Sequence, residues 1–288
     1  MTMSVLVTGS HGRTGKPLVK ALSDQGAVVT AFVRDASQED EMKALGASQI
    51  AVGDMDDPAT IRPALEGCDA IVHIGPPMHP DEKTMTSHFV SAAKEARLSK
   101  FIYYSVMHPL RRDVRHHSLK LDTEEMLIES GMPYSIVQPM RYMQHLEPIW
   151  KRVMNDGVHA MPFNTQVKFN VVDLLDLAEA TARITLEDGW LYGTYELAGP
   201  ISLSQTDMAD IIGNVIGKTV SAEQVPIAAM QEKARAGGAS DDRIKQMTIM
   251  NEHYDAFGFL GNSRILELVL RRKANTFEEY VRRLSTQG

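Results

Sequence analysis

The sequence predicts an α/β protein with a doubly wound parallel sheet, and three observations support this fold class. Short apolar runs alternate with stretches of helical periodicity through the first half of the chain. The runs are rich in β-branched and aromatic residues and lack polar alternation, as is typical of strands buried on both faces. Their strand–helix–strand order implies right-handed crossovers between parallel strands.

Six apolar runs are the expected strands of this sheet. They lie at residues 4–8, 27–33, 49–52, 70–74, 101–105 and 134–137. Helical spacing between them is clearest at residues 16–24, 81–96 and 119–130. Each run is followed by a helical stretch or a turn, so the alternation extends across the first 139 residues.

The regular alternation of strands and helices ends at Pro139. We expect a helix at 140–154, a strand at 163–172, a helix at 174–186, a strand at 193–197, a capped helix at 204–216, a mobile loop at 233–245, and helices at 266–270 and 276–284. Gly237-Gly238 and the many charges of this segment indicate the loop, which is either a lid that closes over the pocket or a disordered loop. We therefore predict a sheet domain over residues 1–139, to which later segments cross back, and a smaller C-terminal α/β substrate lobe over residues 140–288.

Composition is that of an ordinary folded domain. The chain has 288 residues, of which 43% are hydrophobic and 23% charged, so a disordered chain, a collagen and a disulfide scaffold are excluded. Cys68 is the only cysteine and forms no internal disulfide. No apolar run approaches the ~20 residues of a membrane helix, and no signal peptide is evident at the N-terminus. We expect a cytoplasmic protein without membrane contact.

The charge balance disfavours nucleic acid as a partner. The chain has 30 basic and 37 acidic residues, a formal net charge of -7, which opposes long-range attraction to phosphates. The local exception is the basic stretch at 111–117, which is either a solvated loop or an anion-facing rim of a pocket. The expected partner is a small-molecule substrate, and the sequence leaves a homodimer open.

The most informative stretch is a glycine loop with Gly9, Gly12 and Gly15 between the first strand and the first helix. Glycine lets a diphosphate approach the backbone closely and tolerates the positive φ of a tight turn. Amides at the helix N-terminus and the helix dipole then favour the phosphate charge. The pattern inside a βαβ unit predicts dinucleotide binding. The loop residues assigned to it are Gly9, Ser10, His11, Gly12, Arg13, Thr14 and Gly15.

Arg34 follows the second strand, where enzymes that prefer the unphosphorylated cofactor usually place a carboxylate. A guanidinium grips a 2′-phosphate by two parallel hydrogen bonds, whereas an acid repels it. Arg34, supported by Arg13, therefore favours NADP(H) over NAD(H). In the alternative, Asp35 accepts hydrogen bonds from the ribose and Arg34 is a surface residue.

Further cofactor contacts are expected after the later strands. Asp54 suits the adenine amino group while Met55 packs on the ring, although a turn-forming aspartate is an equal alternative. Backbone poor in side chains at Ile74, Gly75 and Pro76 lets a ribose lie close, and Pro139 ends the sixth strand beside them. The alternative for the fourth-strand segment is a plain terminating turn.

Together with the glycine loop, Val33-Arg34-Asp35 and Gly53-Asp54, three later segments resemble the NmrA-like group of atypical short-chain dehydrogenase/reductases. These segments are 117–125, 130–139 and 171–178. The resemblance covers most of residues 4–200. It implies a Rossmann domain, a smaller C-terminal substrate lobe and NADP(H) in the cleft between them. The group includes quinone and dye reductases, and also redox sensors with little or no catalysis.

The chain departs from the ordinary members of this superfamily, which use a serine and a Tyr-x-x-x-Lys pair. Ser105 ends the fifth strand where that serine belongs, and Lys120 matches the lysine. The tyrosine position is His116, one helical turn before Lys120. Tyr103 lies on a strand and does not meet the spacing. Lys120 is expected to bind the nicotinamide ribose, and His116 is a candidate general acid; the alternative for both is a polar helix surface.

No metal site is predicted, because cysteine clusters are absent and adjacent histidines on a helix point apart.

Hydride transfer to a quinone needs fewer catalytic groups from the protein than ketone reduction does, because the cofactor itself supplies the hydride. Expected substrate contacts are Met78, Met107, Tyr142, Met143, Trp150 and Met154, with core filling as the alternative for each methionine. The sequence therefore predicts an NADP(H)-dependent oxidoreductase acting on small, flat, electron-poor substrates. The alternative is a non-catalytic redox sensor that acts through a protein partner.

Overall fold

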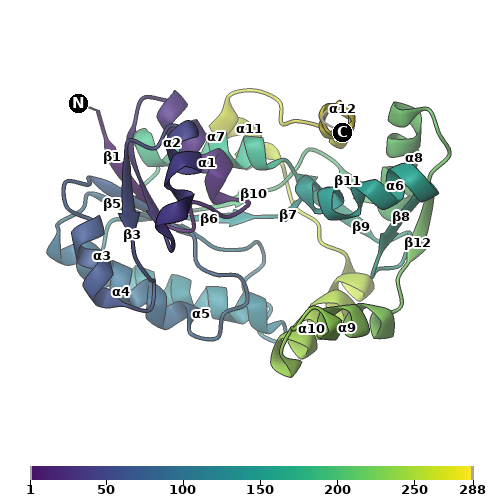
Figure 1. Ribbon diagram of the computed structural model, residues 1–288, viewed down its shortest axis with the longest axis horizontal. Helices are drawn as coiled ribbons and strands as arrows, with labels where there is room; N and C mark the ends of the chain where they lie inside the picture. The colour runs from purple at the N-terminus through teal and green to yellow at the C-terminus, as the bar shows by residue number, and fades with distance from the viewer. Residues whose placement is uncertain (1, 287–288) are drawn as a thin grey trace. The chain divides into compact units, whose positions relative to one another are not determined.

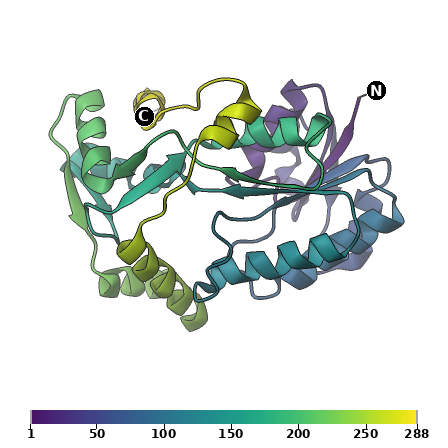
Figure 2. The same ribbon diagram turned by 180° about the vertical axis from the view of Figure 1, so that it is seen from behind.

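The structure, a computed structural model, describes residues 2–286 and divides the chain into two compact units. The first unit comprises the residues up to Leu110 together with His117–Pro139 and Leu174–Glu196. The second comprises Arg111–His116, Met140–Asp173 and the residues from Leu197 onward. Figures 1 and 2 show the elements of both units.

The first unit is built on a seven-stranded sheet in the order β10-β6-β5-β4-β1-β2-β3. Its strands are β1 (Ser4–Val7), β2 (Val28–Val33), β3 (Gln49–Val52), β4 (Ala70–His73), β5 (Lys100–Tyr104), β6 (Tyr134–Pro139) and β10 (Gly193–Leu197). Strands β1 to β6 are parallel to their neighbours within this set. The strand order reverses between β1 and β4, which confirms the predicted doubly wound α/β fold.

Helices cover both faces of this sheet. They are α1 (Gly15–Asp24), α2 (Glu39–Ala44), α3 (Pro58–Ala64), α4 (Glu82–Glu95), α5 (Arg115–Glu129) and α7 (Leu174–Leu186), with a 3₁₀ turn η1 (Ala36–Gln38). Figures 1 and 2 show α3, α4 and α5 on one face and α1 and α7 on the other. Between α4 and the sheet, Leu6, Phe89 and Phe101 are fully buried, each contributing about 2 kcal/mol through removal from water. This packing fixes the carboxyl ends of the strands.

The second unit contains two small sheets. A three-stranded sheet has the order β11-β9-β7, and a two-stranded sheet pairs β12 with β8. The strands are β7 (Arg141–Tyr142), β8 (Val158–Met161), β9 (Lys168–Val172), β11 (Ser202–Ser204) and β12 (Ser221–Gln224). The helices are α6 (Trp150–Asp156), α8 (Gln205–Ile216), α9 (Ile227–Ala236), α10 (Asp241–Phe257), α11 (Arg264–Leu270) and α12 (Phe277–Ser285), with a 3₁₀ segment η2 (Met143–Ile149).

Helix α8 shows how local sequence sets its bounds. The Ser204 hydroxyl accepts from the Asp207 amide, and the Asp207 carboxylate accepts from the Ser204 amide, which forms a capping box. Gly217 ends the helix in the left-handed region with φ 68°. The predicted helix at 204–216 is confirmed.

Three predicted elements of this unit are wrong in part. The helix expected at 140–154 is split into β7, η2 and α6, because β7 pairs with β9 and Pro148 has no amide to donate within a helix. The strand expected from residue 163 begins only at Lys168. The mobile loop expected at 233–245 is helical except for a short turn, since the Ser240 hydroxyl caps α10 by accepting from the Arg243 amide.

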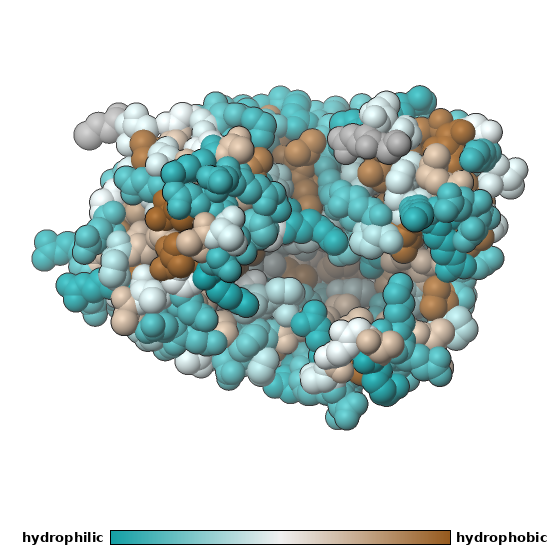
Figure 3. All heavy atoms as spheres, in the orientation of Figure 1, coloured by the Kyte–Doolittle hydropathy of each residue, from teal (hydrophilic) through white to brown (hydrophobic). Residues whose placement is uncertain are grey.

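The surface is mostly polar. In Figure 3 the visible face is largely hydrophilic, with small hydrophobic groups scattered over it. Within residues 2–286, none of the helices combines the length and the apolar character needed to cross a bilayer.

Candidate functional site

The glycine loop joins β1 to α1 in a tight turn. Gly9 has φ 60°, and the Gly12 amide donates to its carbonyl oxygen at 2.9 Å. A Cβ added to Gly15 would lie only 2.2 Å from that same oxygen. Both positions therefore require glycine, the first for its backbone conformation and the second for close approach. The loop presents bare backbone directly before the N-terminus of α1.

Two contacts fix this loop against the neighbouring strands. The Ser10 hydroxyl donates to the Phe32 carbonyl of β2 at 2.8 Å. Gly9 lies against Ile74, where a Cβ would be 2.9 Å from the Ile74 carbonyl oxygen. The carboxyl ends of β1, β2 and β4 thus meet at the loop, which is where doubly wound sheets bind ligands.

A cavity of about 290 Å³ opens at this edge of the sheet. Six residues expected from the sequence to contact cofactor line it: Gly9, Ser10, Arg34, Asp54, Met55 and Pro76. Five further lining residues were not anticipated: Phe32, Gly53, Asp56, His79 and Met85. Their positions near strand ends, or on or just before α4, were the only sequence signal for them. The structure thus gathers much of the expected cofactor set in one cavity.

The two side chains at the end of β2 behave differently. Arg34 is exposed and lines the cavity. Oδ1 of Asp35 accepts from the Ser37 amide at 2.8 Å and caps η1. This hydrogen bond lowers the pKa of the Asp35 carboxyl. The Asp35 carboxylate therefore already accepts a hydrogen bond from the backbone of η1. This disfavours the alternative in which Asp35 accepts hydrogen bonds from the ribose.

Asp54 shapes a turn at the wall of the cavity. Its Oδ1 accepts from the Asp56 amide at 3.1 Å, so it shapes a turn. The same residue lines the cavity, and the neighbouring Met55 packs on the core beneath. The turn holds the Asp54 side chain at the cavity wall.

The outer part of the loop is tied to α2. His11 Nε2 lies 2.7 Å from one oxygen of the Glu41 carboxylate, and Lys16 donates to the other at 2.6 Å. Lys16 and then His11 lower the pKa of Glu41. Arg13 is exposed and Thr14 occupies the N-cap position of α1, and neither lines the cavity. Glu41 was missed from the sequence because it lies 25 residues from Lys16.

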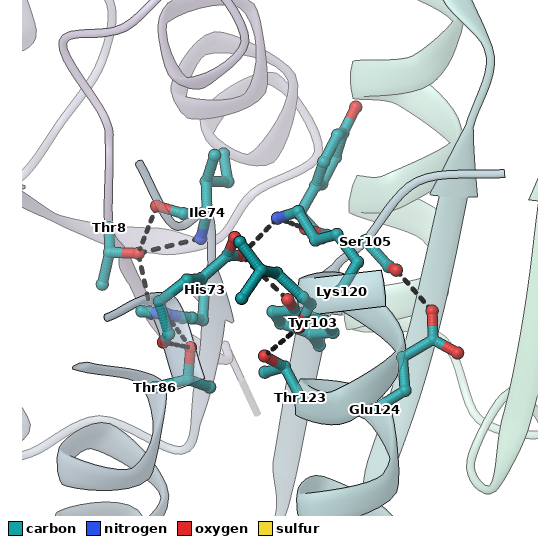
Figure 4. Close-up of polar contacts among 12 residues, drawn as sticks. Thr8, His73, Ile74, Thr86, Tyr103, Ser105, Lys120, Thr123 and Glu124 are labelled. Atoms are coloured by element: carbon teal, nitrogen blue, oxygen red, sulfur yellow. Dashed lines mark hydrogen bonds and ion pairs between the residues drawn. The ribbon is translucent and has the colours of Figure 1, made fainter. Parts of the chain in front are cut away.

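A second polar group lies buried under α5 (Figure 4). Lys120 donates to Oε1 of Glu82 at 2.5 Å and to the Tyr104 carbonyl at 2.9 Å. The Tyr103 hydroxyl donates to the same Glu82 oxygen at 2.9 Å. Burial, followed by the charge of Glu82, raises the pKa of Tyr103, so this phenol stays neutral and keeps its proton. Lys120 is only 5% exposed, so the alternative of a polar helix surface is wrong for it.

Ser105 has its own buried partner. Its hydroxyl donates to Oε1 of Glu124, and the Gln138 amide nitrogen donates to both oxygens of that carboxylate, at 2.9 and 3.1 Å. Burial raises the pKa of Glu124. Figure 4 shows this pair beside Lys120, so the two polar groups form one connected region at the end of β5.

His73 is the third buried polar side chain in this region. Its Nδ1 lies 3.1 Å from the Thr8 hydroxyl and its Nε2 lies 3.1 Å from the Thr86 hydroxyl. Thr86 donates its own proton to the Glu82 carbonyl, so it accepts from Nε2, while Nδ1 faces the Thr8 hydroxyl, which also contacts the Ile74 carbonyl at 3.2 Å. Burial, together with the charge of Lys120, lowers the pKa of His73 to about 3. The ring is therefore neutral and links β4, β1 and α4.

Several other expected site residues are placed as follows. His116 is partly buried on the first turn of α5, whereas His117 is 1% exposed, so the two point apart as expected. Pro139 ends β6 and accepts from the Met107 amide at 3.1 Å. Gly75 approaches Glu82, whose Oε1 would lie 2.9 Å from an added Cβ.

The expected substrate residues do not form one wall within either unit. Met107 is fully buried core, and Met78 lies after β4 with φ 58°. Tyr142 and Met143 line a small cavity of the second unit, whereas Trp150 and Met154 on α6 do not. A core role, the stated alternative, fits Met107.

The basic stretch at 111–117 is largely matched by acids of its own unit. Arg111 pairs with Asp113 at 2.9 Å and Arg115 with Asp242 at 3.4 Å. These side chains are exposed, which favours the solvated loop over an anion-facing rim.

The family model for the NmrA-like family matches residues 1–281. The chain belongs to the NmrA-like family. It is 25% identical over 279 residues to the NAD(P)H azoreductase of Xenophilus azovorans, covering 96% of each chain. The expected family is thereby confirmed.

Two solved structures share the fold of this family member. The NADPH complex of the NADPH-dependent quinone oxidoreductase of Escherichia coli has a TM-score of 0.84 at 22% identity, covering 98% of this chain and 99% of that one. The negative transcriptional regulator NmrA in complex with NADP has a TM-score of 0.79 at 18% identity, covering 98% of this chain and 94% of that one.

Proposed function

We propose that this protein is an NADP(H)-dependent oxidoreductase that transfers hydride to a small, flat, electron-poor substrate such as a quinone. The observation that carries the proposal is the glycine loop opening beside a cavity that has Arg34 in its wall. A reductase role is supported by family members whose names state azo-compound and quinone reduction.

The loop fits a dinucleotide diphosphate. A Cβ at Gly9 or Gly15 would collide with backbone oxygens, so the loop keeps its shape only with bare glycine there. The free amides at the start of α1 then face the site expected for the phosphates, where the helix dipole favours negative charge. In this proposal the first unit binds the cofactor and the second supplies contacts to substrate.

Arg34 makes NADP(H) the favoured cofactor. Its guanidinium is exposed at the cavity, and the neighbouring Asp35 is engaged with Ser37. A planar guanidinium can hold a 2′-phosphate by two parallel hydrogen bonds. In NAD(H) a hydroxyl replaces this phosphate, so Arg34 stabilises only the phosphorylated cofactor strongly.

Lys120 is the residue proposed to orient the reactive end of the cofactor. An ammonium has three donors, and two of them are used by Glu82 and the Tyr104 carbonyl. The remaining donor is available for a ribose hydroxyl. When bound, the nicotinamide supplies the hydride, and the buried pair with Glu82 holds the Lys120 side chain in position.

No tyrosine occupies the position one turn before Lys120, which is the basis for proposing quinones over ketones. A ketone needs a proton delivered to an alkoxide, whereas a reduced quinone anion is a weak base that takes its proton from water. The Ser105 hydroxyl donates its proton to Glu124. His116 is therefore the candidate general acid for an enone or carbonyl substrate.

Steady-state oxidation of NADPH with a panel of quinones, azo dyes and enones tests this proposal. We expect saturable turnover with quinones, and a fall in kcat/KM of more than about tenfold in Lys120→Met, since an interaction with a charged group is lost. The exposed Lys43→Met is the matched control. Absence of turnover with every acceptor, despite tight NADPH binding, would overturn the proposal. Full activity in His116→Gln excludes a catalytic His116.

A non-catalytic redox sensor is the second candidate function. The similarity in fold to a transcriptional regulator that binds NADP favours it, as does histidine at the tyrosine position. Its signature is a protein partner retained differently in the presence of NADP⁺ and NADPH. Identical retention under both conditions, together with quinone turnover, would reject it.

A further inference from the structure

The second unit contains a small cavity whose lining is mainly aromatic and aliphatic but includes four strongly polar side chains. The polar ones are Arg141 on β7, His145 in η2, His159 on β8 and Gln205 at the start of α8. Phe163 and Phe169 are among the apolar ones. The cavity volume is about 30 Å³, enough for one small polar group such as a carboxylate in place of one or two waters.

Arg141 carries a positive charge that has no acidic partner. Its guanidinium lies over the rings of Phe163 and Phe169, at 5.1 and 5.9 Å from their centres. Its hydrogen-bonding contact is with the weak acceptor Sδ of Met161 at 3.7 Å, and across residues 2–286 no carboxylate reaches it. Burial lowers the pKa of Arg141 to about 10, so the guanidinium is still charged at neutral pH. A desolvated cation of this kind is costly unless an anion accompanies it.

Two of these polar residues, His159 and Gln205, each have a buried polar atom without a partner among residues 2–286. His159 Nδ1 and Gln205 Oε1 have no hydrogen-bond partner within the described part of the chain. His159 is 4% exposed, and burial lowers its pKa to about 4, so its ring is neutral at pH 7. The Gln205 amide nitrogen donates to the Glu223 carbonyl at 2.5 Å, which leaves the amide oxygen as the atom without a donor. The unpaired amide oxygen of Gln205 calls for a ligand hydrogen-bond donor, whereas His159 Nδ1 donates or accepts according to the ring tautomer.

We propose that this cavity binds a small hydroxylated carboxylate of about the size of glycolate. The carboxylate pairs with the Arg141 guanidinium, and the ligand hydroxyl donates to Gln205 Oε1. A multiply charged anion such as phosphate would bring negative charge against the Gln205 amide oxygen, and a purely apolar ligand would leave the cation uncompensated. The inference concerns binding alone and does not depend on hydride transfer by the first unit.

Isothermal titration calorimetry of the full chain, without dinucleotide, tests this site with glycolate, acetate and the neutral amide glycolamide. We expect glycolate to bind more tightly than acetate, and glycolamide to bind more than about tenfold more weakly than glycolate because it lacks the charge. In Arg141→Met both acids should lose more than about tenfold in affinity. Arg152→Met, which changes an exposed arginine of the same unit outside the cavity, should bind like the parent protein.

A second measurement separates binding from a merely structural role. Thermal unfolding of Arg141→Met without ligand should show a Tm no lower than that of the parent protein, because an unpaired cation has been removed. Gln205→Leu should retain acetate binding and lose part of the preference for the hydroxylated acid. Absence of heat with both acids, equal affinity for glycolate and glycolamide, or unchanged binding in Arg141→Met would overturn the proposal. If Arg141→Met does not fold, the same comparison is made with Arg141→Lys, which should weaken both acids because one paired hydrogen bond is lost.

Discussion

The ammonium of Lys120 lies 2.5 Å from Oε1 of Glu82, and neither side chain is more than 6% exposed. The carboxylate joins α4 to α5, and through the Tyr103 hydroxyl it also joins β5. A charged pair buried this deeply positions the Lys120 ammonium within narrow limits, because each partner is costly to leave alone.

Glu82→Gln should therefore destabilise the protein strongly. The substitution leaves the buried Lys120 charge without its counter-ion, at a cost of about 3–5 kcal/mol in the free energy of unfolding. Chemical denaturation followed by far-UV circular dichroism measures this cost.

The exposed pair Lys20–Asp24, whose atoms lie 3.0 Å apart on α1, supplies the control for this substitution. Asp24→Asn should change the free energy of unfolding by at most about 0.5 kcal/mol, since solvent screens this pair. Equal losses in the free energy of unfolding of Glu82→Gln and Asp24→Asn would contradict the claim that burial makes the Glu82 pair costly to break.

Gly15→Ala should abolish dinucleotide binding. The added methyl group would lie 2.2 Å from the Gly9 carbonyl oxygen and 2.5 Å from the Ser10 Cα, so the loop must move to accept it. Equilibrium binding of NADPH, followed by nucleotide fluorescence, measures the effect. Gly237→Ala is the matched control, because its Cβ would be no closer than 3.4 Å to its neighbours and its φ is ordinary. Retention of full affinity in Gly15→Ala would contradict the role of the loop.

The buried His73 predicts a loss of stability in acid. Its pKa is lowered to about 3 in the folded chain, whereas an unfolded histidine titrates near 6.5. Between these values the unfolded chain binds one proton more, so the free energy of unfolding falls as pH drops from about 6.5 toward 3. The slope from this residue is at most about 1.4 kcal/mol per pH unit.

Denaturation of the parent protein and His73→Gln between pH 7.5 and 4.5 checks this slope. The variant should be less stable at pH 7.5 but should lose less stability on acidification. Parallel pH profiles would show that His73 is not the group responsible. His159, with its pKa lowered to about 4, contributes to the same acid loss in both proteins and cancels in the comparison.

The sequence predicted those parts of the fold that depend on residues close together in the sequence. Strands β1, β2, β4, β5 and β6 were found because burial on both faces makes each a continuous apolar run. Strand β3 lies at the sheet edge, is partly exposed, and was found from the short apolar run alone. Helix α8 was found because Ser204, Asp207 and Gly217 set its ends locally. Strand β7 was missed because its two residues are extended through pairing with β9, which lies some 30 residues later.

The candidate site also contains some residues that the sequence predicted and others that it did not. The glycine loop and Arg34 were recognised because their roles follow from strand ends and spacing. Glu82 and Tyr103 were missed because their hydrogen bonds with Lys120 join α4, β5 and α5, and Tyr103 was judged only against the spacing within a single helix. Likewise, the unpaired charge of Arg141 depends on which side chains surround it in space, and a single sequence does not contain that information.

The most direct measurement is a calorimetric titration of the purified protein with NADPH and with NADH, repeated on Arg34→Glu. We expect NADPH to bind the parent protein more tightly than NADH does. In the variant, NADPH affinity should fall by more than about tenfold, because two charge-assisted hydrogen bonds are replaced by repulsion, while NADH affinity changes little. No detectable binding of either dinucleotide would contradict the central claim that the glycine loop holds a pyridine dinucleotide.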